Sequence, residues 1–65
     1  MRFNVPDMSC GHCKAAIERA MATADPAATL RFDMEARAVE IDSAIAPAQV
    51  QAVLAEAGYP AQQAA

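Results

Sequence analysis

The sequence predicts an α+β fold, a ferredoxin-like βαββαβ sandwich in which two helices cover one face of a four-stranded antiparallel sheet. Two observations predict it. Short segments that alternate polar and apolar residues are separated by two segments of helical apolar spacing, in the order strand, helix, strand, strand, helix, strand. The chain has 65 residues, of which 18 are the small residue Ala, so it can form one thin hydrophobic core but no second domain.

The first half of the chain is expected to contain a strand, a loop and a helix. Residues 2–5 alternate, and Pro6 favours extended backbone before it, so a short strand ends there. Residues 6–12 form a loop. Over residues 13–24 the apolar side chains recur at spacings of three and four, which indicates a helix with one buried face, and Asp25-Pro26 ends it.

The second half is expected to contain a hairpin, a helix and a weak last strand. Residues 30–34 and 39–42 alternate on either side of a short turn, which predicts a hairpin with one buried face. A helix over residues 47–57 has Pro at its first position and Gly58 just past its end. Residues 59–63 are at best a weak edge strand.

The composition argues against several classes of function. The net charge is −3 and the pI is near 4.7, whereas nucleic-acid-binding domains usually present a basic face. No apolar run reaches the roughly 18 residues of a membrane helix, and the start of the chain lacks the pattern of a signal peptide. We therefore expect a cytoplasmic protein with no membrane insertion. In a reducing compartment, a cysteine pair indicates metal or redox chemistry more often than a structural disulfide.

The chemistry is concentrated in residues 8–14, Met-Ser-Cys-Gly-His-Cys-Lys. Cys10 is expected on the loop and Cys13 in or near the first helical turn, so the two sulfurs can converge where the helix N-terminus favours thiolate. Gly11 gives the loop freedom to turn. Two soft thiolates suit Cu(I) better than a closed zinc site, which normally requires four ligands.

A redox function is the alternative reading of the same residues. Residues 10–13, Cys-Gly-His-Cys, are identical to the redox string of protein disulfide isomerases. Those enzymes resemble thioredoxin, which is longer than this chain and has an aromatic residue before the first cysteine, where this sequence has Ser9. A third reading makes the cysteines small buried apolar residues, although the polar residues around them favour exposure.

A family resemblance extends over about residues 2–63. Met8-x-Cys10-x-x-Cys13, the helix that follows, the hairpin and the Ala-Gly-Tyr ending at Tyr59 resemble the heavy-metal-associated domain family, most closely its free-standing bacterial copper chaperones. The resemblance implies a single domain over residues 1–65.

The resemblance also implies a cargo and a partner. Cu(I) would be held by Cys10 and Cys13 and handed by ligand exchange to a copper-transporting P-type ATPase. A metal-bridged homodimer, and carriage or buffering of mercury, cadmium or zinc instead of copper, stay open.

Four neighbouring residues are accessory candidates. The resemblance implies that Met8 packs under the loop and is not a ligand, and that Tyr59 lies close to the metal loop. His12 is either a third ligand or hydrogen-bond donor to a thiolate, or a solvent-facing loop side chain. Lys14 either offsets the charge of the bis-thiolate and steers docking, or is simply a solvated helix residue.

The sequence departs from the family pattern at three places. Asp7 stands where the family usually has Gly before its Met. Residues 26–29, Pro-Ala-Ala-Thr, replace the usual Gly-Val before the second strand, which leaves the start of that strand open. Ala46 is a poor N-cap for the second helix, which is about 1 kcal/mol less stable than it would be with a capping side chain there.

Overall fold

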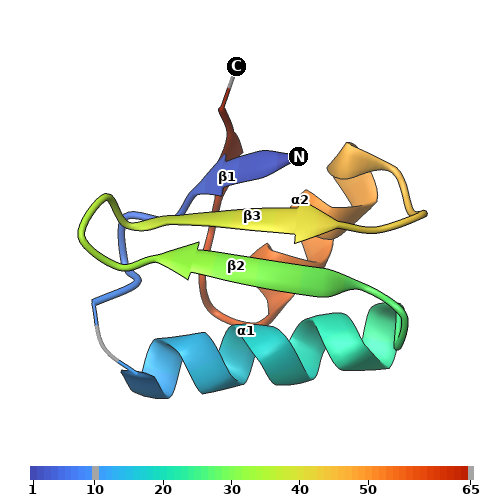
Figure 1. The fold of residues 1–65 in the computed structure, drawn as a ribbon, viewed down its shortest axis with the longest axis horizontal. Coiled ribbons are helices and arrows are strands. Elements are labelled where there is room, and N and C mark those ends of the chain that lie inside the picture. Colours follow the sequence, from blue (N-terminus) through green and yellow to red (C-terminus); the bar gives the residue numbers. More distant parts are fainter. Residues whose placement is uncertain (10, 65) are drawn as a thin grey trace.

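The computed structural model, which describes residues 1–9 and 11–64, confirms the predicted βαββαβ order (Figure 1). The elements are β1 (Arg2–Asn4), α1 (Gly11–Ala24), β2 (Thr29–Asp33), β3 (Ala38–Asp42), α2 (Pro47–Glu56) and β4 (Gln62–Gln63).

The four strands form one antiparallel sheet in the order β2-β3-β1-β4. β1 is therefore an interior strand, and its Phe3 lies opposite Val39 of β3. β4 is an edge strand, as predicted for residues 59–63, but it is two residues long, because only Gln62 and Gln63 pair with its neighbour β1. The loop that leaves β1 thus starts from the interior of the sheet.

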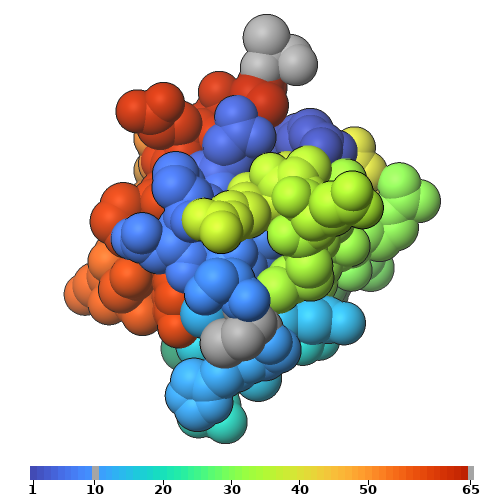
Figure 2. Space-filling view, turned by 90° about the vertical axis from the view of Figure 1, so that its left-hand side faces the viewer, coloured from blue at the N-terminus to red at the C-terminus, as the bar shows by residue number. Residues whose placement is uncertain are grey.

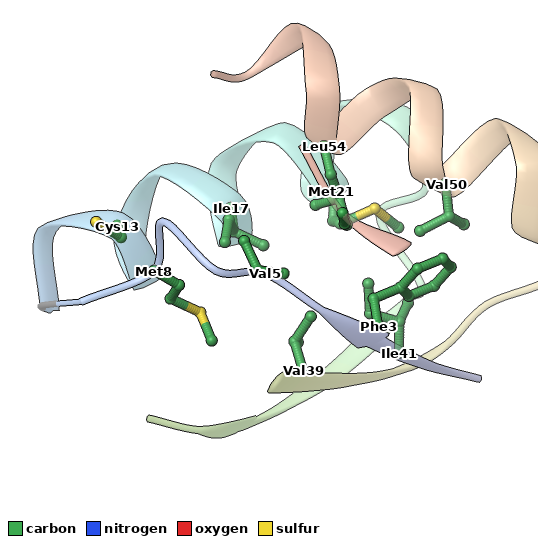
Figure 3. Packing of buried hydrophobic residues seen from close by; sticks show 11 residues of the cluster. Phe3, Val5, Met8, Cys13, Ile17, Met21, Val39, Ile41, Val50 and Leu54 are labelled. Carbon is green, nitrogen blue, oxygen red and sulfur yellow. The ribbon is translucent and has the colours of Figure 1, made fainter. Parts of the chain in front are cut away.

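Both helices cover the same face of the sheet, and the core lies between the two layers (Figure 3). The largest fully buried side chains come from β1 and the loop after it, β3 and both helices: Phe3, Val5, Met8, Ile17, Met21, Val39, Ile41, Val50 and Leu54. The other face is polar, and Arg31 of β2 pairs with Glu40 of β3 at 2.9 Å across it. The alternation of polar and apolar residues predicted this division because successive strand residues face opposite sides.

α1 begins at Gly11, two residues before the predicted start, so the prediction of a loop over residues 6–12 was wrong at its end. The apolar spacing reports only the buried face of a helix. Cys13 is the first buried residue of α1, and the exposed Gly11 and His12 before it add nothing to the pattern. Gly11 is the first residue of α1, and a Cβ there would meet nothing within 4 Å, so lack of space does not require glycine at this position.

The end of α1 is linked to the start of β2 by Asp25. Its N–H donates to the carbonyl of Met21 at 2.7 Å, and its carboxylate accepts the N–H of Ala27 at 3.1 Å. A turn closes when the N–H of Ala28 donates to the carbonyl of Asp25 at 3.0 Å. β2 therefore starts at Thr29, which settles the strand start that the sequence left open and moves the strand one residue from the predicted 30–34.

The ends of α2 follow the sequence signals. Ala46 is the N-cap without any side-chain cap, and Pro47 occupies the first helical position. Gly58 adopts φ 94°, a conformation that favours glycine after a helix. The N–H of Tyr59 then donates to the carbonyl of Leu54 at 2.9 Å, which closes the helix end one residue earlier than predicted, at Glu56.

Candidate metal site

The candidate site lies at the end of the sandwich where β1 leads into α1. Figure 2 shows this face, with the loop after β1 between the β2–β3 turn and the segment that joins α2 to β4. Of the two predicted ligands, Cys13 is the third residue of α1, and Cys10 lies outside the described residues. The geometry of the site can therefore be built from Cys13 and its neighbours.

The loop is anchored at two buried side chains. Val5 and Met8 are both fully buried, and the N–H of Met8 donates to the carbonyl of Val5 at 3.0 Å. Pro6 and Asp7 between them are exposed, and Pro6 has the second position of this four-residue turn, which its fixed φ favours. The chain thus makes a compact turn directly before the cysteine motif.

Cys13 faces this turn from the start of α1. It is buried at the edge of the hydrophobic core and 7% exposed, so the expectation of an exposed side chain was wrong for Cys13. Its Sγ donates to the backbone carbonyl of Asp7 over 3.8 Å. The first turn of a helix carries partial positive charge and N–H groups without helical partners, which stabilises a thiolate. The structure therefore places a shielded thiol at a helix N-terminus that favours a thiolate, and the bond to the Asp7 carbonyl is released when the thiol loses its proton.

Met8 belongs to the hydrophobic core. It is fully buried, and Figure 3 shows its thioether directed into the core, away from the sulfur of Cys13. An unbranched thioether adapts readily to irregular spaces in a core. Met8 therefore supports the loop from beneath.

The other three accessory candidates differ in exposure. His12 is exposed. Lys14 is also exposed, and its Nζ lies 5.4 Å from the ring centroid of Phe32 in β2. Tyr59, between α2 and β4, is half-buried and packs against the core.

Arg37 contacts the same loop, and the sequence reasoning missed it. Its carbonyl accepts the N–H of Val5 at 2.8 Å, and its Nη1 donates to the carbonyl of Pro6 at 3.0 Å. Arg37 has φ 53°, in the left-handed region. The sequence did contain an indication of this residue. A short hairpin turn often needs one residue with left-handed backbone, and because residues 34–37 include no Gly or Asn, another residue type must adopt it.

Residues 1–9 and 11–64 contain neither a larger cluster of metal-binding side chains nor a membrane-spanning helix. Three or more His, Cys, Asp or Glu side chains do not gather anywhere as a group that could hold a metal ion. No helix in this part of the chain has the length and apolar character needed to cross a membrane.

Comparison with known proteins gives consistent matches. Residues 2–60 match the heavy-metal-associated domain family. The chain is 36% identical over 60 residues to the copper chaperone CopZ of Staphylococcus aureus strain MRSA252, and the match covers 88% of each chain.

Solved structures agree with this result. A crystal structure of a gold binding protein superposes with a TM-score of 0.94 at 33% identity and covers 98% of each chain. The copper chaperone Atx1 from Synechocystis PCC6803, in a His61Tyr form, has a TM-score of 0.92 at 31% identity, with 95% of this chain and 98% of that one covered.

Proposed function

Because this chain belongs to the heavy-metal-associated domain family, we propose that it is a cytosolic copper chaperone. Residues 1–65 act as a single domain. The cargo is Cu(I), Cys10 and Cys13 are its ligands, and the recipient is a copper-transporting P-type ATPase. The chain is a carrier and not an enzyme, in keeping with relatives that are named as copper chaperones.

The placement of Cys13 is the observation that carries this proposal. Its sulfur lies at the positive end of α1, and 7% of the side chain is exposed, so it is shielded and still close to the surface. Cys10 precedes it by three residues. A pair of thiolates is a soft donor set, which favours Cu(I) over ions that prefer oxygen ligands.

Transfer proceeds by exchange of thiolates. With two protein ligands, Cu(I) has room for a third, so an incoming thiolate of the recipient forms a Cu–S bond first. One Cu–S bond to Cys10 or Cys13 then breaks, and the released thiolate takes up a proton. Repetition with the second cysteine completes the transfer, and the ion is never released into water.

The fold weighs against the redox alternative. Disulfide isomerases that use Cys-Gly-His-Cys resemble thioredoxin, whereas this chain has the βαββαβ order. We therefore expect the reduced apoprotein to show no reduction or isomerisation of insulin disulfides above that of a small dithiol. Catalytic turnover in this assay would favour the oxidoreductase.

Anaerobic titration with Cu(I) against a chromogenic chelator tests the proposal. We expect one tightly held Cu(I) per chain in the wild type and loss of tight binding in both Cys10→Ser and Cys13→Ser. Ser9→Ala is the matched control, since Ser9 is exposed and lies within the same motif. Wild-type affinity in either cysteine variant would contradict the ligand assignment.

Two additional measurements test the alternatives for cargo and assembly. Parallel titrations with Zn(II), Cd(II) and Hg(II) rank the soft metals, and native mass spectrometry reports whether two chains share one ion. Retention of Zn(II) or Cd(II) in the presence of one equivalent of Cu(I) would replace the proposed cargo, whereas binding of Hg(II), the softest of these ions, is expected for any thiolate pair.

A further inference from the structure

We propose that Arg37 is a positioning residue for the metal loop, acting through the turn that faces Cys13. This inference rests on the proposed function, since it concerns the order of the loop that would hold the cargo. Arg37 lies in the β2–β3 turn, 24 residues after Cys13, and has no place in the cysteine motif. It therefore acts on the site from a separate part of the fold.

Two hydrogen bonds join Arg37 to consecutive residues of the loop. The backbone carbonyl of Arg37 accepts the N–H of Val5 at 2.8 Å, and Nη1 of its guanidinium donates to the carbonyl of Pro6 at 3.0 Å. The second bond is charge-assisted, which makes it stronger than a bond between neutral groups. Figure 2 shows the β2–β3 turn lying against this loop.

The turn held in this way presents its next carbonyl to the cysteine. Asp7 follows Pro6 directly, and its carbonyl lies 3.8 Å from Sγ of Cys13. The guanidinium holds the peptide unit between Pro6 and Asp7, and the adjoining unit, which carries the Asp7 carbonyl, is held by the Met8–Val5 hydrogen bond. Val5 and Met8 on either side are fixed by burial. The guanidinium thus holds the exposed part of a turn whose two ends are already anchored.

The backbone of Arg37 gives an independent indication of this role. A left-handed φ of 53° is unfavourable for a residue with a Cβ, and Gly adopts it without that cost. Gly at this position would avoid the steric cost of the left-handed backbone, but it would lack the side chain that bonds Pro6. Ordering of a loop before its ligand arrives strengthens binding, because less conformational entropy is lost on binding.

The variants are chosen to separate the side chain from the backbone. Arg37→Gly removes the guanidinium and relieves the left-handed conformation, so the fold should persist, and Arg37→Asn is a second variant that tolerates this φ. Arg37→Lys keeps a charged donor of similar reach. Arg31→Ala is the matched control, since it removes an exposed Arg of β2 that pairs with Glu40 and does not touch the loop.

Amide hydrogen exchange of Met8 in the apoprotein and Cu(I) affinity by chelator competition are the two readouts. We expect Arg37→Gly and Arg37→Asn to speed exchange of the Met8 amide and to weaken Cu(I) binding, each by about three- to tenfold. Arg37→Lys should recover most of both effects. Arg31→Ala should match the wild type, with unfolding midpoints of all variants close together.

The outcomes distinguish this inference from the proposed function. Wild-type exchange and affinity in both Arg37→Gly and Arg37→Asn would overturn the positioning role and leave the chaperone assignment intact. An equal loss of Met8 protection and Cu(I) affinity in Arg31→Ala would also overturn it, because removal of one positive charge would then explain both variants. Failure of the wild type to bind Cu(I) would overturn the proposed function, and the exchange of Met8 would then decide the role of Arg37 by itself.

Discussion

The ammonium group of Lys14, at the start of α1, lies over the aromatic ring of Phe32 in β2, with Nζ 5.4 Å from the ring centroid. A cation at this distance is attracted by the negative face of the ring. Lys14 directly follows Cys13, so the contact links the part of the helix that carries the candidate ligand to the second strand. It also gives the positive charge beside the cysteine a defined position.

We expect Lys14 and Phe32 to be coupled in stability. A double-mutant cycle with Lys14→Ala and Phe32→Leu should give a coupling energy of about 0.5–1 kcal/mol, because Leu keeps apolar packing and removes the ring. Urea denaturation of the four proteins measures it. Lys14→Arg should retain the coupling, and a value indistinguishable from zero would mean that Lys14 is only a solvated residue.

Replacement of Met8 should affect stability far more than metal binding. Met8→Ala leaves a cavity under the loop and should cost about 2–5 kcal/mol, whereas Met8→Leu fills the space and should cost less than about 1.5 kcal/mol. Urea denaturation measures both. Cu(I) affinity of the folded Met8→Leu protein should equal that of the wild type, and a large loss there would identify Met8 as a ligand.

Asp25 should make the stability depend on pH in the acid range. Its carboxylate accepts the hydroxyl of Ser43 at 2.6 Å and the N–H of Ala27, and these bonds hold the pKa of Asp25 below its ordinary value of 3.8. A lowered folded pKa stabilises the protein above the unfolded pKa, and the benefit is lost as pH falls through the folded value.

Asp25→Asn should therefore be less stable than the wild type at about pH 6, and the deficit should shrink as pH falls below about 4. Urea midpoints over a pH series measure it. Ser43→Ala should reduce the same pH dependence, since it removes the largest cause of the shift. A deficit that stays constant down to about pH 2 would contradict the assignment.

A capping side chain at the start of α2 should stabilise the protein. Ala46 has an extended backbone conformation suited to an N-cap and makes no side-chain cap. Ala46→Ser or Ala46→Asp should add about 1 kcal/mol by accepting a hydrogen bond from a free N–H of the first turn. Thermal and urea unfolding measure the gain. Ala48→Ser, inside the exposed first turn, is the control and should add nothing.

The alternation of side chains predicted the hairpin to within one residue, because one face of β3 is buried and the same face of β2 is partly buried, while the other face is exposed. Val39 and Ile41 point into the core, and Glu40 between them pairs with Arg31. The start of α1 was predicted two residues too late, because the exposed His12 adds nothing to an apolar pattern. Burial patterns thus locate the middle of an element better than its ends.

The candidate site was predicted only in part. The cysteine motif and its neighbours are local in sequence, so the pattern identified them, and the place of Cys13 at the start of α1 agrees with expectation. The assignment of Cys10 and Cys13 as ligands stays a prediction. Arg37 was missed because its contact with Pro6 joins residues 31 apart, and no periodicity reports a bond between two loops.

The order of strands has a consequence for how the molecule assembles. Both neighbours of β1, β3 and β4, come later in the sequence than the loop that β1 leads into. A growing chain therefore cannot anchor that loop until β3 has been made, and pairings between distant segments form slowly. A chain truncated before the β2–β3 turn would lack both the strand that pairs with β1 and the Arg37 that bonds the loop, so Cys13 would have neither the sheet nor the anchored turn beside it.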